Sequence, residues 1–115
     1  MSYVMLIVEP EGQRHERSRA EGEDLYRQMT DYAQKLKDER LLVSVNSLRE
    51  AAVRVNVRNG KPSVTDGPFT EARELVGGFF LLNVATREEA LRLARECPAA
   101  QWATVEVRET GPCYE

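Results

Sequence analysis

The chain has 115 residues, of which 42% are hydrophobic and 30% are charged. This length and composition predict one globular domain with a hydrophobic core of its own. The formal net charge is −3, with acidic and basic residues interleaved. A nucleic-acid-binding surface needs clustered Lys and Arg, and the one basic group, at Arg14, Arg17 and Arg19, is diluted by neighbouring glutamates. We therefore expect no nucleic-acid partner.

The cysteines and the N-terminal residues argue against several further classes of protein. Cys97 and Cys113 belong to no CxxC or Cys/His grouping, which argues against a disulfide framework or a zinc site. The apolar run at residues 3–8 is short, turns acidic at Glu9 and follows no positively charged segment. We therefore expect neither a signal peptide nor a membrane span, and a cytoplasmic protein.

The first third of the chain predicts a strand, a loop and a helix. Residues 3–8 read as a strand buried on both faces and ended by Glu9. Residues 9–22 are polar, contain the single histidine, His15, and predict a mobile or functional loop. From about residue 22 to 40 the apolar positions recur every three or four residues, which predicts a helix. Its apolar stripe is Leu25, Met29, Ala33 and Leu36, and a short extended stretch follows at 41–43.

The middle of the chain predicts a hairpin. Residues 51–58 alternate, with three valines on one face and Arg54, Asn56 and Arg58 on the other. The Asn59-Gly60 pair predicts a tight turn, and residues 61–65 the returning strand. Residues 66–69 break the pairing because they contain a proline. A short helical turn is expected at 70–76.

The last third predicts strand, helix and strand. Residues 78–84 are apolar on both faces. Thr86 and Glu89 form a capping-box pattern for a helix that ends at Pro98, and residues 103–108 alternate again. Without the inserted hairpin the order is βαββαβ. This order predicts an α+β, ferredoxin-like fold with an antiparallel sheet and two helices on one face.

Burial requirements predict a homodimer. Two helices cover only one face of a four-stranded sheet, yet strands 3–8 and 78–84 are apolar on both faces. Burying each large apolar side chain contributes about 1.5–3 kcal/mol, so a bare second face would be costly. A second copy packed on the same face is the simplest cover. Polar residues of the other strands would line part of the shared space, or face solvent as edge residues.

The segment around Asp66-Gly67-Pro68-Phe69 is the most distinctive in the chain. In one interpretation it is a structural corner, where Asp66 accepts backbone hydrogen bonds and Phe69 anchors in the core. In the other, the rigid turn presents Asp66 to a cleft as a general acid or base. Glu74 is the nearest candidate for a second carboxylate.

An enzymatic hypothesis follows from the second interpretation. Asp66 would carry the catalysis on a small organic substrate, and the candidate substrate-binding residues are Arg54, Glu74, Glu106 and Phe69. No glycine-rich nucleotide motif is present, so we expect chemistry that is either cofactor-free or uses a weakly held metal, for instance one held by Asp66 and Glu74, and we assign no metal ligand. His15 reads as an exposed loop residue; as a base it would need an orienting carboxylate, for which Glu11 or Glu16 could serve.

Residues 61–80, KPSVTDGPFTEARELVGGFF, resemble the signature of the DGPF family of YCII-related proteins. The opening YVMLIV, the segments QKLKDERLL and TREEALRLARECP, and the closing VEVRE are also similar to that family. The resemblance covers nearly the whole chain. It implies a ferredoxin-like fold that assembles as a dimeric α/β barrel. It implies no settled activity, and some relatives are linked to extracytoplasmic-function sigma factors.

The wider family also implies a site built on a His and an Asp, and this chain departs from that pattern. The first-helix position of the histidine falls near Gln28, and His15 lies in the loop. Relatives often carry Gly-Glu where Val45-Asn46 precede Ser47-Leu48 here. Only Asp66 matches directly. The leading hypothesis is therefore a dimeric domain that binds a small molecule or a partner protein, with the enzyme and a sigma-factor-associated regulator as alternatives.

Overall fold

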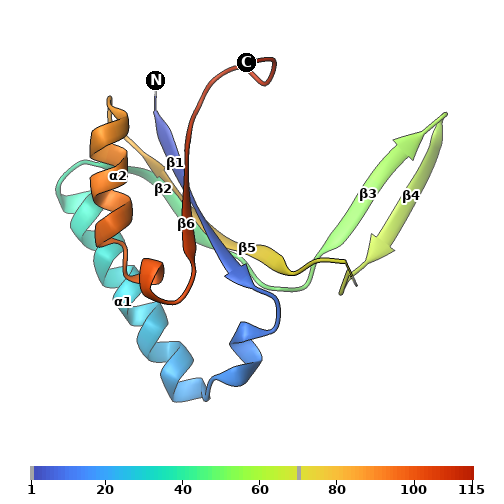
Figure 1. The fold of residues 1–115 in the computed structure, drawn as a ribbon, viewed down its shortest axis with the longest axis horizontal. Helices are drawn as coiled ribbons and strands as arrows, with labels where there is room; N and C mark the ends of the chain where they lie inside the picture. The colour runs from blue at the N-terminus through green and yellow to red at the C-terminus, as the bar shows by residue number, and fades with distance from the viewer. Residues whose placement is uncertain (1, 70) are drawn as a thin grey trace.

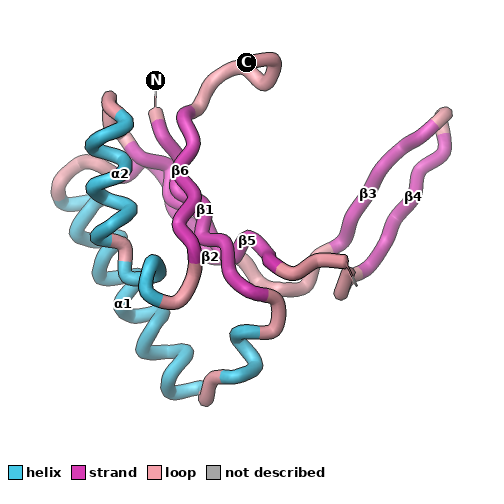
Figure 2. Tube along the Cα trace, in the orientation of Figure 1, coloured by secondary structure: helices cyan, strands magenta, loops and turns pink. Residues whose placement is uncertain are grey.

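A computed structural model describes residues 2–69 and 71–115. Figure 1 and Figure 2 show how its elements are arranged. In chain order they are β1 (Tyr3–Pro10), η1 (Gln13–Glu16), α1 (Arg19–Asp38), β2 (Leu42–Ser47), β3 (Val53–Arg58), β4 (Lys61–Asp66), β5 (Glu74–Leu82), α2 (Arg87–Glu96), η2 (Pro98–Gln101) and β6 (Thr104–Glu109).

The main sheet has four strands in the order β2-β5-β1-β6, and each neighbouring pair is antiparallel. Helices α1 and α2 lie together on one face of this sheet (Figure 1). With β3 and β4 set aside, this is the ferredoxin-like βαββαβ fold predicted from the sequence. Strands β2 and β6 are the two edges, so the sheet of a single chain is open.

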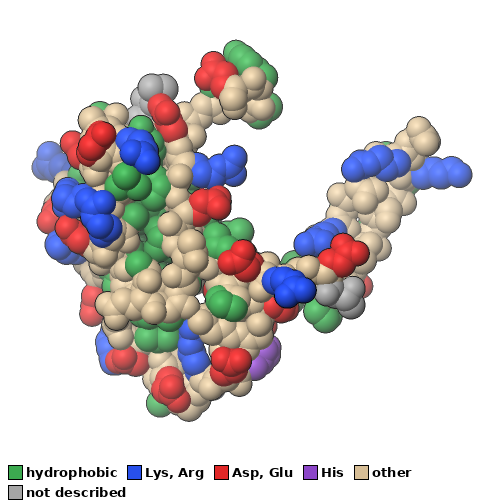
Figure 3. All heavy atoms as spheres, in the orientation of Figure 1, with side chains coloured by type: hydrophobic (Ala, Val, Ile, Leu, Met, Phe, Trp, Pro, Cys, Tyr) green, Lys and Arg blue, Asp and Glu red, His purple; other side chains and the backbone are tan. Residues whose placement is uncertain are grey.

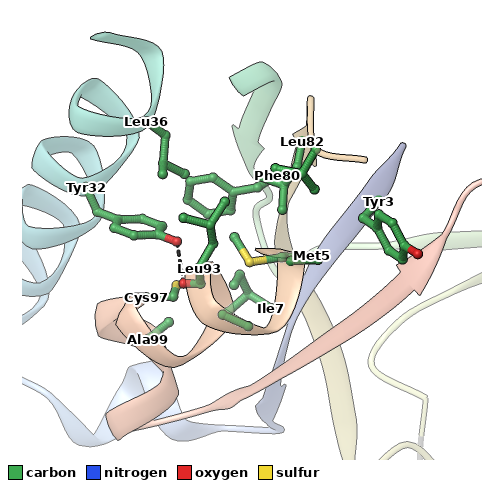
Figure 4. Close-up of a cluster of buried hydrophobic side chains, with 13 residues drawn as sticks. Tyr3, Met5, Ile7, Tyr32, Leu36, Phe80, Leu82, Leu93, Cys97 and Ala99 are labelled. Atoms are coloured by element: carbon green, nitrogen blue, oxygen red, sulfur yellow. Dashed lines mark hydrogen bonds between the residues drawn. The ribbon is translucent and has the colours of Figure 1, made fainter. Parts of the chain in front are cut away.

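The core lies between the sheet and the two helices (Figure 4). Met5, Leu36, Leu82 and Leu93 are almost completely buried there, and they come from β1, α1, β5 and α2. The ring of Tyr32 packs edge-on against Phe80, with centroids 5.6 Å apart.

Tyr32 also ties α1 to α2. Its hydroxyl donates to the Leu93 carbonyl oxygen at 2.6 Å, in the last turn of α2, where helical carbonyls lack intrahelical donors. Burial raises the pKa of Tyr32 far above its ordinary value, because the phenolate would be desolvated.

The connection between β1 and α1 is shorter than the sequence predicts. Strand β1 continues through Glu9 to Pro10, and Glu9 is only 5% exposed, so the expected end of the strand at Glu9 is wrong. Helix α1 begins at Arg19 rather than near 22, because Ser18 and Glu21 form a reciprocal capping box. Part of the remaining connection is the short helix η1.

The helical turn expected at 70–76 is also wrong. The Ala72 amide donates to the Phe69 carbonyl at 2.9 Å, which closes a single turn, and β5 then begins at Glu74. Thr70 lies outside the described residues. At the start of α2, by contrast, Thr86 caps the helix as predicted, with its hydroxyl accepting from the Glu89 amide at 3.2 Å.

Strands β3 and β4 form a separate two-stranded sheet, hereafter the arm (residues 53–66). Asn59 and Gly60 have positive φ angles of 52° and 75°, as the predicted tight turn requires. Every residue of both strands is exposed. The arm points away from the rest of the molecule, hereafter the body (Figure 1). The radius of gyration is 16.1 Å, whereas a compact domain of this length has about 13 Å.

Candidate ligand cleft between α1 and the sheet

A cleft of about 830 Å³ runs along the N-terminal half of α1, between this helix, the sheet and the segment that follows η2. Its apolar wall comes from α1, from the helix-facing side of the sheet and from the single tryptophan. These residues are Ile7, Leu25, Met29, Ala33, Val45, Phe80 and Trp102. The volume and the apolar lining are typical of sites for small organic molecules.

The cleft exists because the apolar face of α1 is fully buried only in the C-terminal half of the helix. Tyr32 and Leu36, in the second half of the helix, are buried. Leu25, Met29 and Ala33 were predicted as core residues of the same stripe, but they are only partly buried and line the cleft. The helical periodicity therefore identified the apolar face of α1 without indicating where along the helix that face meets a cover.

One end of the cleft is polar and built around Glu9. The Arg14 guanidinium donates from Nε and Nη2 to Glu9 Oε1, at 2.9 and 2.5 Å. Nη1 of the same side chain donates to the Leu48 carbonyl at 2.8 Å. A single arginine from η1 thus compensates a buried carboxylate of β1 and binds the end of β2.

Gly77 provides the space for the Glu9 carboxylate. The pairing of β1 with β5 shifts between Ile7 and Val8, which leaves Gly77 as the extra residue of a bulge. A Cβ atom built on Gly77 would overlap Glu9 Oε1, and it would lie 2.8 Å from Arg14 Nη2. The glycine is therefore required by the close approach of this ion pair to the backbone of β5.

Six charged side chains line the cleft, four basic and two acidic. They are Glu9, Arg14, Arg17, Arg19, Glu23 and Arg49. Four of them form two ion pairs with each other. The other two are Arg17, which donates from Nη2 to Gln13 Oε1 at 2.9 Å, and Arg49. Within residues 2–69 and 71–115, neither has a carboxylate within salt-bridge distance, so the rim of the cleft is positively charged.

His15 lies on the outer side of η1 and does not line the cleft. Its Nε2 is 2.9 Å from Glu50 Oε2, so the carboxylate beside it comes from the segment between β2 and β3, not from Glu11 or Glu16. The other carboxylate oxygen of Glu50, Oε1, is buried and has no hydrogen-bond partner in the described part of the chain. The imidazole itself is largely exposed.

Three of the predicted site residues lie at the root of the arm. Asp66 ends β4 opposite Val53 and is exposed. The Arg54 guanidinium lies over the Phe69 ring, 3.7 Å from its centroid. The expected anchoring of Phe69 in the core is therefore wrong: the ring is half-buried beneath Arg54, because the chain turns at the arm root before it reaches β5.

The other two predicted residues are far from one another in the sheet. Glu74 begins β5 opposite Pro10, whereas Glu106 lies on β6 opposite Leu6, on the face without helices. None of the five predicted residues lines the cleft. The acid–base role of Asp66 and the substrate-binding roles of the other four stay predictions.

The residues at the polar end of the cleft were missed because Arg14 and Arg17 were assigned to a solvated loop. Two signals in the sequence point to a more ordered segment. Ser18 and Glu21 have capping-box spacing, which moves the helix start forward. The Gly77-Gly78 pair inside an apolar strand indicates a bulge or a close approach.

Further features of the described residues bear on metals, thiols and membranes. In the described ranges, no group of three or more His, Cys, Asp or Glu side chains could hold a metal ion. Cys97 is buried and Cys113 exposed, and both are free thiols; burial raises the pKa of Cys97. Neither described helix has the length and apolarity needed to cross a bilayer.

Comparison with known proteins shows the family of this chain and a relative. The family model for the YCII-related domain matches residues 1–112. An uncharacterized protein of Rhizobium meliloti (strain 1021) is 30% identical over 106 residues, which cover 90% of this chain and 86% of the relative. The association with a sigma factor stays a prediction, because the description of this relative names no partner.

Proposed function

The chain belongs to the YCII-related domain family, and we propose that this member is a homodimeric binding protein for a small organic acid. The ligand would occupy the cleft between α1 and the sheet, with its apolar part against the α1 stripe. Its carboxylate would lie at the rim, near Arg17 and Arg49. The single observation that carries the proposal is that these two guanidinium groups line an apolar cleft and have no carboxylate partner among residues 2–69 and 71–115.

Charge is the reason for choosing an acid over a neutral ligand. The chain as a whole is acidic, with a net charge of −3, yet arginines outnumber glutamates in the cleft by four to two. A guanidinium group binds a planar carboxylate through two parallel hydrogen bonds. The ion pair of Arg14 with Glu9 leaves Arg14 less available, so Arg17 and Arg49 are the expected anchors.

The apolar wall of the cleft indicates the chemical nature of the uncharged part of the ligand. Met29 and Phe80 face the cleft together with Trp102, and flexible thioether and aromatic side chains favour a flat or branched hydrocarbon group. An aryl-substituted short-chain acid combines both requirements, and phenylacetate is a simple probe of this class. Benzyl alcohol has a similar apolar part without the charge.

Trp102 allows a direct test because it is the only tryptophan in the chain and lines the cleft. We expect phenylacetate to change Trp102 fluorescence saturably, with a dissociation constant at least tenfold lower than that of benzyl alcohol. Double replacement Arg17→Gln and Arg49→Gln should weaken phenylacetate binding at least tenfold and leave benzyl alcohol binding unchanged.

The matched control is Arg87→Gln, an exposed arginine at the first position of α2 that does not line the cleft. It should leave both affinities unchanged. Equal binding of the acid and the alcohol, or full binding by the double variant, would contradict the proposed ligand class.

The homodimer rests on the face of the sheet opposite the helices. Val4, Leu6 and Val8 of β1 lie on this face, and β5 adds Phe79 and Leu81 beside them. No described element covers these side chains, and a second copy related by a two-fold axis would bury both faces at once and could complete a barrel. Sedimentation velocity at micromolar concentration should give a dimer. A well-folded monomer under these conditions would contradict the proposal.

A further inference from the structure

Gln13, the first residue of η1, lies behind the rim of the cleft and does not line it. Its side-chain amide makes two hydrogen bonds to cleft residues that come from distant parts of the chain. Nε2 donates to the Trp102 carbonyl oxygen at 2.7 Å, and Oε1 accepts from Arg17 Nη2 at 2.9 Å. One neutral side chain thus joins the tryptophan of the apolar wall to one of the two arginines expected to bind the ligand carboxylate.

The two partners fix the orientation of the Gln13 amide. A carbonyl oxygen only accepts hydrogen bonds and a guanidinium group only donates them, so the NH₂ group faces Trp102 and the oxygen faces Arg17. Trp102 is the residue at which η2 ends, where carbonyl groups lack a donor from the helix itself. Gln13 supplies that donor. An ionised carboxylate in its place could only accept, and a cation could only donate, so neither would satisfy both partners.

The segment that carries this amide is itself anchored to the sheet. The helix η1 begins after Gly12, whose φ of 82° lies in the left-handed region that favours glycine. The residue after the amide is Arg14, which binds the Glu9 carboxylate of β1 and the Leu48 carbonyl after β2. An amide on an anchored segment holds Arg17 in a defined position, and this lowers the entropy lost when a ligand binds.

The hydrogen bond between Gln13 and Arg17 brings no opposing charge to the guanidinium group. Over the face of the body drawn in Figure 3, acidic and basic side chains lie intermingled. Four arginines of the chain pair directly with carboxylates: Arg14, Arg19, Arg27 and Arg92. A guanidinium group has five N–H donors, and the bond to Gln13 uses one of them. The amide therefore holds Arg17 without neutralising its charge, and leaves donors for a ligand.

We propose that Gln13 is a positioning residue that sets the preference of the cleft for acids over uncharged ligands. It holds Arg17 at the rim and keeps the positive charge of that guanidinium available to a ligand carboxylate. This inference rests on the proposed binding of a small organic acid, and it adds the residue that makes one of the two anchors effective.

The first test is Gln13→Glu, which keeps the shape of the side chain and replaces the neutral amide by a carboxylate. The new carboxylate would pair with Arg17 and would have no donor for the Trp102 carbonyl. At pH 7, calorimetric titration should show phenylacetate binding weakened about fivefold, the size of one exposed charge pair, and benzyl alcohol binding unchanged. An equal loss for both ligands would mean that Gln13 only supports the fold, and would overturn the inference.

The matched control is Gln101→Glu. Gln101 is exposed, directly precedes Trp102 and does not line the cleft, so this variant adds the same charge without reaching the rim. Both affinities should stay unchanged. If the control weakens phenylacetate binding as much as Gln13→Glu does, the effect is one of net charge and the inference is overturned.

A second variant, Gln13→Met, separates positioning from charge. Methionine has a similar length, makes neither hydrogen bond and adds no charge, so Arg17 would be free to move. Phenylacetate binding should weaken about threefold, because the ligand must then immobilise the arginine, and benzyl alcohol binding should not change. Wild-type affinity for phenylacetate in this variant would overturn the positioning role.

A double-variant cycle tests whether Gln13 acts through Arg17. In a chain that already carries Arg17→Gln, the further change Gln13→Glu should weaken phenylacetate binding by less than about twofold, because the anchor that it neutralises is gone. A full additional loss of about fivefold in that background would show an effect independent of Arg17, and would overturn the inference.

The inference and the proposed function can fail separately. If the wild-type chain binds phenylacetate no better than benzyl alcohol, both fail. If the wild type prefers the acid and the Arg17→Gln, Arg49→Gln variant loses this preference, while the Gln13 variants keep it, the inference about Gln13 alone is overturned.

Discussion

Strand β1 and strand β3 are both indicated by local apolar patterns, a continuous apolar run in β1 and strict alternation in β3, and they end in opposite environments. In β1 the residues alternate between buried and partly buried, because the helices cover one face, while the side chains on the other face are flanked only by those of β5 and β6 among the described residues. In β3 all six residues are exposed, although valine alternates with polar residues. Alternation therefore specifies a strand with one apolar face, whereas the cover of that face depends on the rest of the fold or on another chain.

The largest contrast between body and arm should appear when matched apolar side chains are truncated. Leu82 is completely buried, so Leu82→Ala should lower the free energy of unfolding by about 3–4 kcal/mol through lost burial and an unfilled cavity. Val55→Ala, measured by urea unfolding of dilute, monomeric protein, should lower it by about 0.5 kcal/mol or less. Equal losses would mean that the arm packs on its own body.

A smaller contrast concerns two arginines. Arg14→Ala would leave the Glu9 carboxylate, whose side chain is 7% exposed, without its cation. We expect a loss of about 2–3 kcal/mol in unfolding free energy, below the usual cost of breaking a fully buried pair because the Arg14 side chain is 32% exposed. In the arm, Arg58 is exposed and donates to the carbonyl of its neighbour Val57, and Arg58→Ala should cost about 0.5 kcal/mol or less.

Adding Glu9→Leu to the Arg14→Ala chain should recover part of the loss, because no charge is then buried without a partner. A double variant less stable than Arg14→Ala alone would contradict the role given to this ion pair.

A third prediction concerns the hydrogen bond that joins α1 to α2 inside the body. Tyr32→Phe should lower the unfolding free energy by about 1–2 kcal/mol at pH 7, because the Leu93 carbonyl loses its donor. The exposed Tyr26 gives a control, and Tyr26→Phe should have almost no effect.

The raised pKa of Tyr32 adds a pH dependence. Above about pH 10 an unfolded tyrosine loses its proton while the buried one keeps it, so the unfolded state binds fewer protons and stability falls as pH rises. The Tyr32→Phe protein lacks this contribution. Its deficit relative to wild type should therefore shrink between pH 9.5 and 11, by about 1 kcal/mol per pH unit. Thermal or urea unfolding of both proteins measures this difference. If the stability deficit of Tyr32→Phe stays constant from pH 9.5 to 11, the raised pKa of Tyr32 does not contribute.

The smallest expected effect is at the start of α1. Ser18→Ala removes the hydroxyl that accepts from the Glu21 amide at 3.1 Å, and should cost about 1 kcal/mol. Ser63→Ala in the exposed β4 strand should lower the unfolding free energy by only a few tenths of a kcal/mol. Circular dichroism during urea unfolding measures both, and a Ser18→Ala protein as stable as wild type would contradict the capping role.

The fold was predictable because each element carries a local signal strong enough to place it. The apolar runs that became β1 and β5, the α1 stripe and the Asn59-Gly60 turn are all patterns of neighbouring residues. The errors occurred where a distant partner decided the outcome. Glu9 was read as the end of a strand, and it stays within the strand because Arg14 compensates its charge.

The candidate site was less predictable for a related reason. The sequence directed attention to the rigid corner at Asp66, a local feature, whereas the cleft is formed by α1, the sheet and the residues after η2 together. Arg17 and Arg49 are far apart in the sequence, and each looks like an ordinary surface residue. Only the three-dimensional arrangement makes the two a pair at the rim of one apolar cleft.

The absence of a side chain at Gly77 makes the residues at positions 9, 14 and 77 depend on one another. Its missing side chain is the space that the Glu9 carboxylate occupies, and Arg14 is the cation that makes this carboxylate tolerable there. No single replacement at any of the three sites leaves the other two well accommodated. Among related sequences, the identities at positions 9, 14 and 77 should therefore change together, so that a chain with a side chain at 77 also lacks the acid at 9 and the arginine at 14.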